Sequence, residues 1–218
     1  LKHLSDTGQH KDKEFKEKYV YGLSYVPNGI LSDHSLRAHV SPTSCQREDV
    51  MHILYSNGLM GFEMQSVLDA AKKRYGMTWE NVRNHIEQIG WKTNGLTTNA
   101  LVQVFSHQKE KNQVDHVKGS ATQLFVIYPI FRFWVETNLK GKHLLALPLA
   151  SILCLFEVCD LLIDARNCRC PDKIPAVVQK LRKAITTFLA ARKKAYGTKS
   201  FRFKHHQLLH VPNQIEQD

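Results

Sequence analysis

Acidic residues are missing from one long stretch of this sequence. Between Lys173 and Ile215 there is no Asp or Glu, whereas ten Lys or Arg residues fall there. The whole chain carries a formal net charge of +10, so the residues outside this stretch are close to neutral taken together. A basic region of this kind favours an anionic partner, most often a nucleic acid, although a solvated surface without such a partner is the alternative.

Other features that would assign a function are also missing. The sequence has no Gly-rich phosphate loop, no internal repeat and no Cys-x-x-Cys pair. Its five cysteines are irregularly spaced, which argues against a disulfide framework and for a reducing compartment. Residues 1–18 are rich in Lys, Asp and Glu, unlike a signal peptide. We therefore expect a nuclear or cytoplasmic protein that is not secreted.

Long uninterrupted apolar runs are missing as well. The longest candidate, residues 144–163, is interrupted by Pro148, Glu157 and Asp160. We interpret it as a core helix and expect no membrane partner. The hydrophobic content of 43% is adequate for a packed core.

Apolar residues recur mostly at helical spacing, which predicts a mainly α fold, a multi-helix array with little or no sheet. The expected helices cover about 46–55, 61–75, 79–89, 97–105, 121–139, 148–163 and 175–196. Ser44 is the expected cap of the first helix, and Pro129 predicts a kink or two successive helices within 121–139.

The rest of the chain is predicted to be less regular. We expect a charged, disordered tail over 1–18, a short strand near 19–24 and a polar linker over 108–119. Residues 19–216 are then one predominantly helical domain.

An acid and a histidine stand at the start of the first predicted helix. Asp49 and His52 are three residues apart, so a helix places them on one face. The carboxylate could bind Mg²⁺, with His52 orienting a water or a phosphate oxygen. The alternative is that Asp49 only favours the helix start and His52 packs beside Tyr55.

Histidines cluster near the other end of the chain. His206 and His210 have the i, i+4 spacing that directs two imidazoles to one metal, and His205 with His210 is a looser alternative. Zinc normally takes four ligands, and the sequence shows no obvious partners. The alternative is a helix with histidines at solvated and half-buried positions.

The basic region combines cations with aromatic residues. Phe201-Arg202-Phe203-Lys204-His205 interleaves the two, as suits phosphate contacts with occasional base stacking. The predicted nucleic-acid contacts are Lys180, Arg182, Lys183, Arg192, Lys193, Lys194, Lys199, Arg202 and Lys204. A solvated charged face is the competing interpretation.

These stretches resemble a known family. Asp49-Val50-Met51-His52, followed by Asn57-Gly58 and Glu63, is similar to the "D-x-M-H … G-V … E" stretch of transposase-derived proteins of the CACTA/EnSpm type. The most specific match is to their "K-H-H-x-L-L-H-x-P" stretch, which resembles Lys204-His205-His206-Gln207-Leu208-Leu209-His210-Val211-Pro212. Weaker likenesses occur at Tyr21-Gly22-Leu23, Ala121-Thr122-Gln123 and 147–165, in the same order.

The resemblance implies an RNase H-like nuclease core interrupted by a large helical insertion. Three acids of such enzymes hold two Mg²⁺ or Mn²⁺ ions that activate the nucleophile attacking a DNA phosphodiester. By resemblance Asp49 is the second acid, with His52 beside it, and His206 and His210 belong to a zinc-binding insertion. The first and third acids have no match here, so we expect the chain to be the helical insertion region of such a core, with little or no sheet retained. It would be a DNA-binding fragment of a transposable element that is catalytically inactive alone.

Two alternatives remain open at this point. The chain could be a helical protein-interaction module without a nucleic-acid role. It could also be a complete nuclease that recruits other acids such as Glu63, Asp160 or Asp164. The oligomeric state and the target DNA sequence do not follow from the residues.

Overall fold

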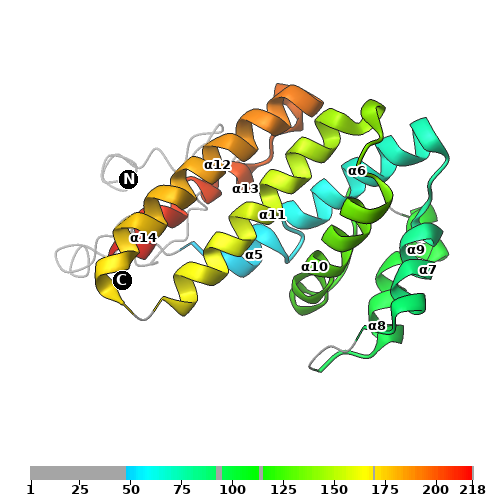
Figure 1. The fold of residues 1–218 in the computed structure, drawn as a ribbon, viewed down its shortest axis with the longest axis horizontal. Coiled ribbons are helices and arrows are strands. Elements are labelled where there is room, and N and C mark those ends of the chain that lie inside the picture. Colours follow the sequence, from blue (N-terminus) through cyan, green and yellow to red (C-terminus); the bar gives the residue numbers. More distant parts are fainter. Residues whose placement is uncertain (1–47, 92–94, 113–114, 169, 218) are drawn as a thin grey trace, which may run out of the picture. The chain divides into compact units, whose positions relative to one another are not determined.

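Helices account for all the regular secondary structure in the part of the chain that the computed structural model describes, residues 48–91, 95–112, 115–168 and 170–217 (Figure 1). The all-α class predicted from the apolar periodicity is therefore confirmed for these residues. They belong to one compact unit, Glu48–Asp218. The predicted tail over 1–18, the strand near 19–24 and the Ser44 cap lie outside the described residues.

The order of the elements follows the predicted pattern closely. The α-helices are α5 (Val50–Leu54), α6 (Leu59–Tyr75), α7 (Trp79–Ile89), α8 (Thr98–Val102), α9 (His107–Asn112), α10 (Ala121–Asn138), α11 (Ala146–Asn167), α12 (Ile174–Tyr196), α13 (Phe203–Leu208) and α14 (Val211–Gln217). Short 3₁₀ turns connect some of them: η2 (Gln103–Phe105), η3 (His143–Leu145), η4 (Pro171–Lys173) and η5 (Thr198–Ser200).

Caps in the sequence explain where several helices begin and end. Gly76 and Gly90 end α6 and α7 in the left-handed conformation, with φ of 66° and 60°, which glycine adopts without steric cost. Ser120 and Gln123 form a reciprocal capping box at the start of α10.

Three details of the prediction differ from the structure. Val50 is the first residue of α5, because Asp49 rather than an earlier residue caps it. The helix α10 continues through Pro129 as one element, and buried Ile127, Ile130 and Phe131 hold both sides of the proline in the core. The segment predicted as a polar linker contains α9, and its Val117 is fully buried with its N–H donating to the Gly61 carbonyl at 3.0 Å.

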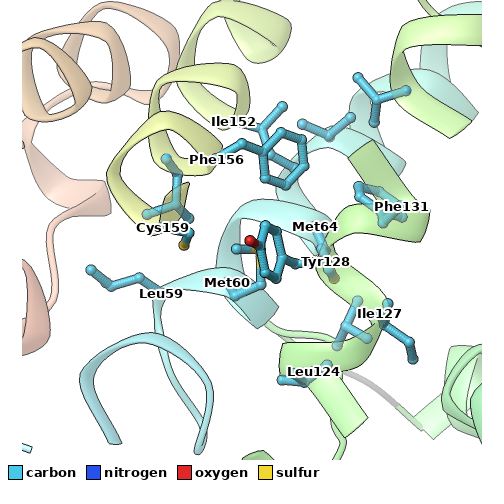
Figure 2. Close-up of a cluster of buried hydrophobic side chains, with 14 of the residues drawn as sticks. Leu59, Met60, Met64, Leu124, Ile127, Tyr128, Phe131, Ile152, Phe156 and Cys159 are labelled. Atoms are coloured by element: carbon cyan, nitrogen blue, oxygen red, sulfur yellow. The ribbon is translucent and has the colours of Figure 1, made fainter. Parts of the chain in front are cut away.

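The centre of the core lies where α6, α10 and α11 meet. Figure 2 shows Met60 and Met64 of α6, Tyr128 and Phe131 of α10 and Phe156 of α11 gathered in one cluster, with further apolar side chains around them. The rings of Trp79 and Phe105 continue this core toward α7, with 5.7 Å between their centroids. Burial of these side chains is the main stabilising contribution to the unit.

A helical hairpin of α11 and α12 forms the second half of the unit (Figure 1). One stripe of α12, with Val178, Leu181, Ile185 and Phe188, is buried at spacings of three and four residues. The helix α14 also packs on α12, and α6 packs on α11.

The helix α11 is strongly apolar. Residues His143–Asn167 have a mean hydropathy of 2.1 over their most apolar stretch, long enough by length and composition to cross a membrane, and 44% of that stretch is buried inside the protein. The core helix of a soluble protein meets the same criterion, so this property alone assigns no location.

A buried ion pair crosses the core. Glu63 of α6 is 0% exposed and Arg192 of α12 is 4% exposed, and the guanidinium pairs with the carboxylate. Ser151 of α11 donates its hydroxyl to both Glu63 oxygens at 3.1 Å, and the guanidinium of Arg192 donates to the Ser200 carbonyl at 3.1 Å. Burial raises the pKa of the Glu63 carboxyl, and Arg192 opposes that shift. Three helices are thereby joined by one polar network.

This network leads to a prediction about stability. Arg192→Met should lower the free energy of unfolding by about 3–5 kcal/mol, because it leaves the Glu63 carboxylate buried without its cation. The double variant Glu63→Gln/Arg192→Met should lose clearly less than Arg192→Met alone. Urea denaturation measures both values, and Lys193→Met, which changes the exposed neighbour, is the matched control. Equal losses in the single and double variants would contradict the ion pair.

Candidate functional site

The two stretches singled out in the sequence lie against each other, since α5 contacts α13. The Lys204 ammonium donates to the carbonyls of His52 at 2.6 Å and Ser56 at 2.7 Å, near the C-terminal end of α5. Carbonyls at a helix end have no partner within the helix, so Lys204 supplies it. Burial lowers the pKa of Lys204, an effect that the nearby Asp49 opposes. We call this contact the α5–α13 junction.

Two glutamines form hydrogen bonds with Glu48, next to the junction. Gln207 donates its side-chain amide to the Glu48 carboxylate at 2.9 Å, and the Glu48 N–H donates to Gln214 Oε1 at 2.7 Å. No motif in the sequence singles out these residues. Polar residues within a short amphipathic helix carry no signal that identifies their partners.

Asp49 acts as the N-cap of α5. Its Oδ1 accepts the N–H groups of Met51 at 2.9 Å and His52 at 3.2 Å, and its Oδ2 lies 2.5 Å from His52 Nδ1. The hydrogen bond from the His52 side chain is the main reason that the pKa of Asp49 is lowered. Both side chains are exposed. The predicted acid–histidine pair is therefore present, with the carboxylate used as a helix cap.

His206 and His210 meet, although α13 ends between them at Leu208. Their Nε2 atoms are 3.2 Å apart on the surface. Two imidazole nitrogens bound to one tetrahedral zinc ion at the usual bond length would be about 3.3 Å apart, so the spacing suits a shared metal. Nowhere among the described residues do three or more His, Cys, Asp or Glu gather around one point, so neither this pair nor Asp49–His52 has a third ligand there.

His205 does not take part in this pair. Its side chain is 2% exposed and lies between the rings of Phe188 and Phe201, at centroid distances of 5.9 and 5.1 Å. Its Nδ1 accepts the Arg202 N–H at 2.9 Å. Burial, with the charge of Arg192 as a smaller cause, lowers the pKa of His205 to about 4. His205 is thus packed in the core, whereas His210 is exposed on the surface beside His206.

The predicted nucleic-acid contacts divide into three groups. Arg192 and Lys204 point inward and have the partners described above, so Arg192 in particular is no surface contact. Arg182 and Arg202 are exposed but paired: Arg182 binds Glu216 through two hydrogen bonds of 2.7 Å, and Arg202 lies 3.4 Å from Asp115. The remaining cations are exposed and form no ion pair within the described part of the chain: Lys180, Lys183, Lys193, Lys194 and Lys199.

Three of these lysines form one face of α12. At 100° per residue Lys180, Lys183 and Lys194 fall within about 60° of one another, on the side opposite the buried stripe. They span about 21 Å along the axis. We call this the lysine face. The helix contains no acidic residue that could neutralise it.

The acids considered for an alternative nuclease centre are dispersed. Glu63 is held in the core by Arg192 and Ser151. Asp160 pairs with Arg132 and accepts the Tyr128 hydroxyl at 3.3 Å, and Asp164 is exposed. They do not gather into a carboxylate cluster within the described residues.

Comparison of the chain with protein-family models, with curated proteins and with solved structures gave no match.

The α5–α13 junction leads to a second prediction. Lys204→Met should lower the free energy of unfolding by about 1–2 kcal/mol, because two carbonyls lose their charged donor. The amides of α5 should also exchange faster in hydrogen-exchange experiments. Lys199→Met removes the same charge from an exposed site and should change stability by less than about 0.5 kcal/mol. Unchanged α5 exchange in Lys204→Met would contradict the junction.

His205 leads to a prediction about pH. Its pKa is about 4 in the folded protein and 6.5 in the reference state, so between these values the unfolded chain binds a proton that the folded chain does not. Stability should therefore fall as pH is lowered, by about 2 kcal/mol between pH 7 and pH 5 from this residue. His205→Gln, which keeps a side-chain acceptor, should flatten the profile by this amount. Urea denaturation at each pH measures it, and parallel profiles would exclude the role of His205.

Proposed function

We propose that the chain is a DNA-binding segment derived from a transposase of the CACTA/EnSpm type, acting in the nucleus and without catalytic activity of its own. The observation that carries the proposal is the lysine face of α12. Its three cations are exposed, unpaired within the described residues and carried by a helix without acids.

Structural roles account for only part of this charge. Lys193 and Lys194 lie in the last turn of α12, where cations interact favourably with the helix dipole. Lys180 and Lys183 are in the interior of the helix and gain nothing from that effect. Like charges on one face repel each other, and binding to a row of phosphates relieves the repulsion. A polyanion therefore explains the arrangement better than solvation does.

The proposal of inactivity rests on the state of the acids. Asp49 is used as a helix cap, and Glu63 is neutralised by Arg192 in the core. Mg²⁺ or Mn²⁺ at Asp49 would then belong to the ancestral enzyme. Zn²⁺ at His206 and His210 is supported by the spacing of their Nε2 atoms and would need ligands beyond this pair.

The lysine face gives a testable prediction. In the triple variant Lys180→Gln/Lys183→Gln/Lys194→Gln, affinity for duplex DNA should fall, and the slope of log K against log salt should become shallower by about 2–3. Fluorescence anisotropy at several salt concentrations measures both quantities.

A charge-matched variant controls for the loss of net charge. Lys73→Gln/Lys111→Gln/Lys140→Gln removes three exposed lysines from elements other than α12. Its salt slope should remain close to that of the unmodified protein. A wild-type chain that does not bind DNA, or equal slopes in the two triple variants, would contradict the proposal.

A helical protein-interaction module is the second candidate. Leu144 of η3 and Leu147 and Leu153 of α11 are 47%, 41% and 38% exposed, and apolar side chains of this size favour a protein partner. A partner that stays bound to the chain after nuclease treatment and in the α12 triple variant would favour this function over DNA binding. A partner lost on nuclease treatment would favour DNA.

A further inference from the structure

Three aromatic rings follow one another on the surface around α13, with their planes tilted by 40° between Phe203 and His206 and arranged edge to face, at 79°, between His206 and His210. Phe203 is 69% exposed, the largest exposed fraction among the large apolar side chains of the described residues. Its ring centroid is 6.3 Å from that of His206, which is in turn 4.8 Å from that of His210. Both histidines are exposed as well. We call these rings the aromatic row.

Phe203 is exposed although other aromatic rings of the same segment are packed inward. Its neighbours Phe201 and His205 turn inward and pack together at 5.1 Å, and His205 also stacks on Phe188. Packing of this short segment is therefore already provided by other rings. An exposed phenylalanine ring gains no burial energy in the isolated protein, whereas a partner that covers it would provide that energy.

The charges beside the aromatic row favour an anionic partner. Lys199 and Arg202 lie within four residues of Phe203 and are exposed. No acid occurs between Lys173 and Ile215. The Asp115 carboxylate, 3.4 Å from Arg202, offsets part of this charge, and the Arg202 guanidinium also lies 5.0 Å from the Phe62 ring centroid. Rings next to cations suit a ligand with both flat faces and phosphates.

We propose that Phe203, His206 and His210 form a stacking platform for the bases of single-stranded nucleic acid. The proposal rests on the proposed DNA binding and specifies the form of the ligand at this site. Bases in a duplex stack on each other and expose only their edges, whereas unpaired bases present a face to an aromatic ring. The lysine face contacts the phosphates of single-stranded and duplex nucleic acid alike. The aromatic row distinguishes the two, because only unpaired bases stack on it.

The experiment compares a single strand of about 20 nucleotides with the duplex of the same sequence, using the full chain and fluorescence anisotropy in EDTA. Phe203→Ala should weaken single-strand binding by about 5- to 150-fold, the range expected for loss of one stacking contact. Duplex binding should change less than about twofold, because phosphate contacts are retained. Phe203→Trp should retain or strengthen single-strand binding.

Leu209→Ala provides the matched control. Leu209 is 45% exposed and lies at the end of α13, but it has no ring, so its removal should leave both affinities unchanged. Because Phe203 is exposed, its replacement should not affect folding, and unchanged urea denaturation checks this. EDTA removes zinc, so single-strand binding by the wild-type chain is also measured without EDTA. Binding that occurs without EDTA and is lost in its presence would assign the histidine pair to a metal and overturn the platform.

The outcomes separate this inference from the proposed function. Equal weakening of single-strand and duplex binding by Phe203→Ala, or no weakening of either, would overturn the stacking platform. Neither result would contradict the proposed binding of DNA phosphates by the lysine face, which the α12 triple variant tests. A wild-type chain that binds neither form would overturn both.

Discussion

The ion pair between Glu63 and Arg192 is the interaction on which the rest of the described unit depends. It joins α6 to α12, and Ser151 brings in α11 between them. A buried ion pair provides little net stability compared with an apolar contact, but it tolerates little displacement once formed. Apolar side chains could pack α6, α11 and α12 in several registers. Each of the two buried charges is costly without the other. We therefore infer that the Glu63–Arg192 pair selects the one helix register in which Arg192 also donates to the Ser200 carbonyl.

The register of α12 against α6 and α11 also determines the position of α13. Ser200 precedes the segment in which His205 packs on Phe188 of α12 and Phe201 packs on His205, and this packing orients α13. With α13 in place, Lys204 reaches the end of α5, and Gln207 reaches Glu48. The contact between α5 and α13 thus follows from the packing of the core.

Periodicity was enough to predict most helices, because their burial follows from local spacing. It was not enough to predict which polar residues are buried. Arg192 continues the stripe of Leu181, Ile185 and Phe188, and Glu63 interrupts the apolar positions of α6 in the same way. Each is a charge on an apolar stripe, which signals a buried partner. The partner itself lies 129 residues away, and no local pattern identifies it. The position of Asp49 as a cap likewise depended on where α5 begins, the least regular feature of the pattern.

The fold also determines which cations of the basic region are available to a partner. Counted along the sequence, its ten cations form one polyanion-binding segment. In the folded chain some of them neutralise acids or complete the core, and the lysines that remain available include the three placed opposite the buried stripe of α12. The aromatic residues divide in the same way, since Phe201 supports the core while Phe203 faces solvent. The side chains of this basic segment therefore form two sets. An inner set of buried side chains positions α13, and an outer set of exposed cations and rings is available to a ligand. Substitutions in the inner set test folding, and only those in the outer set test recognition.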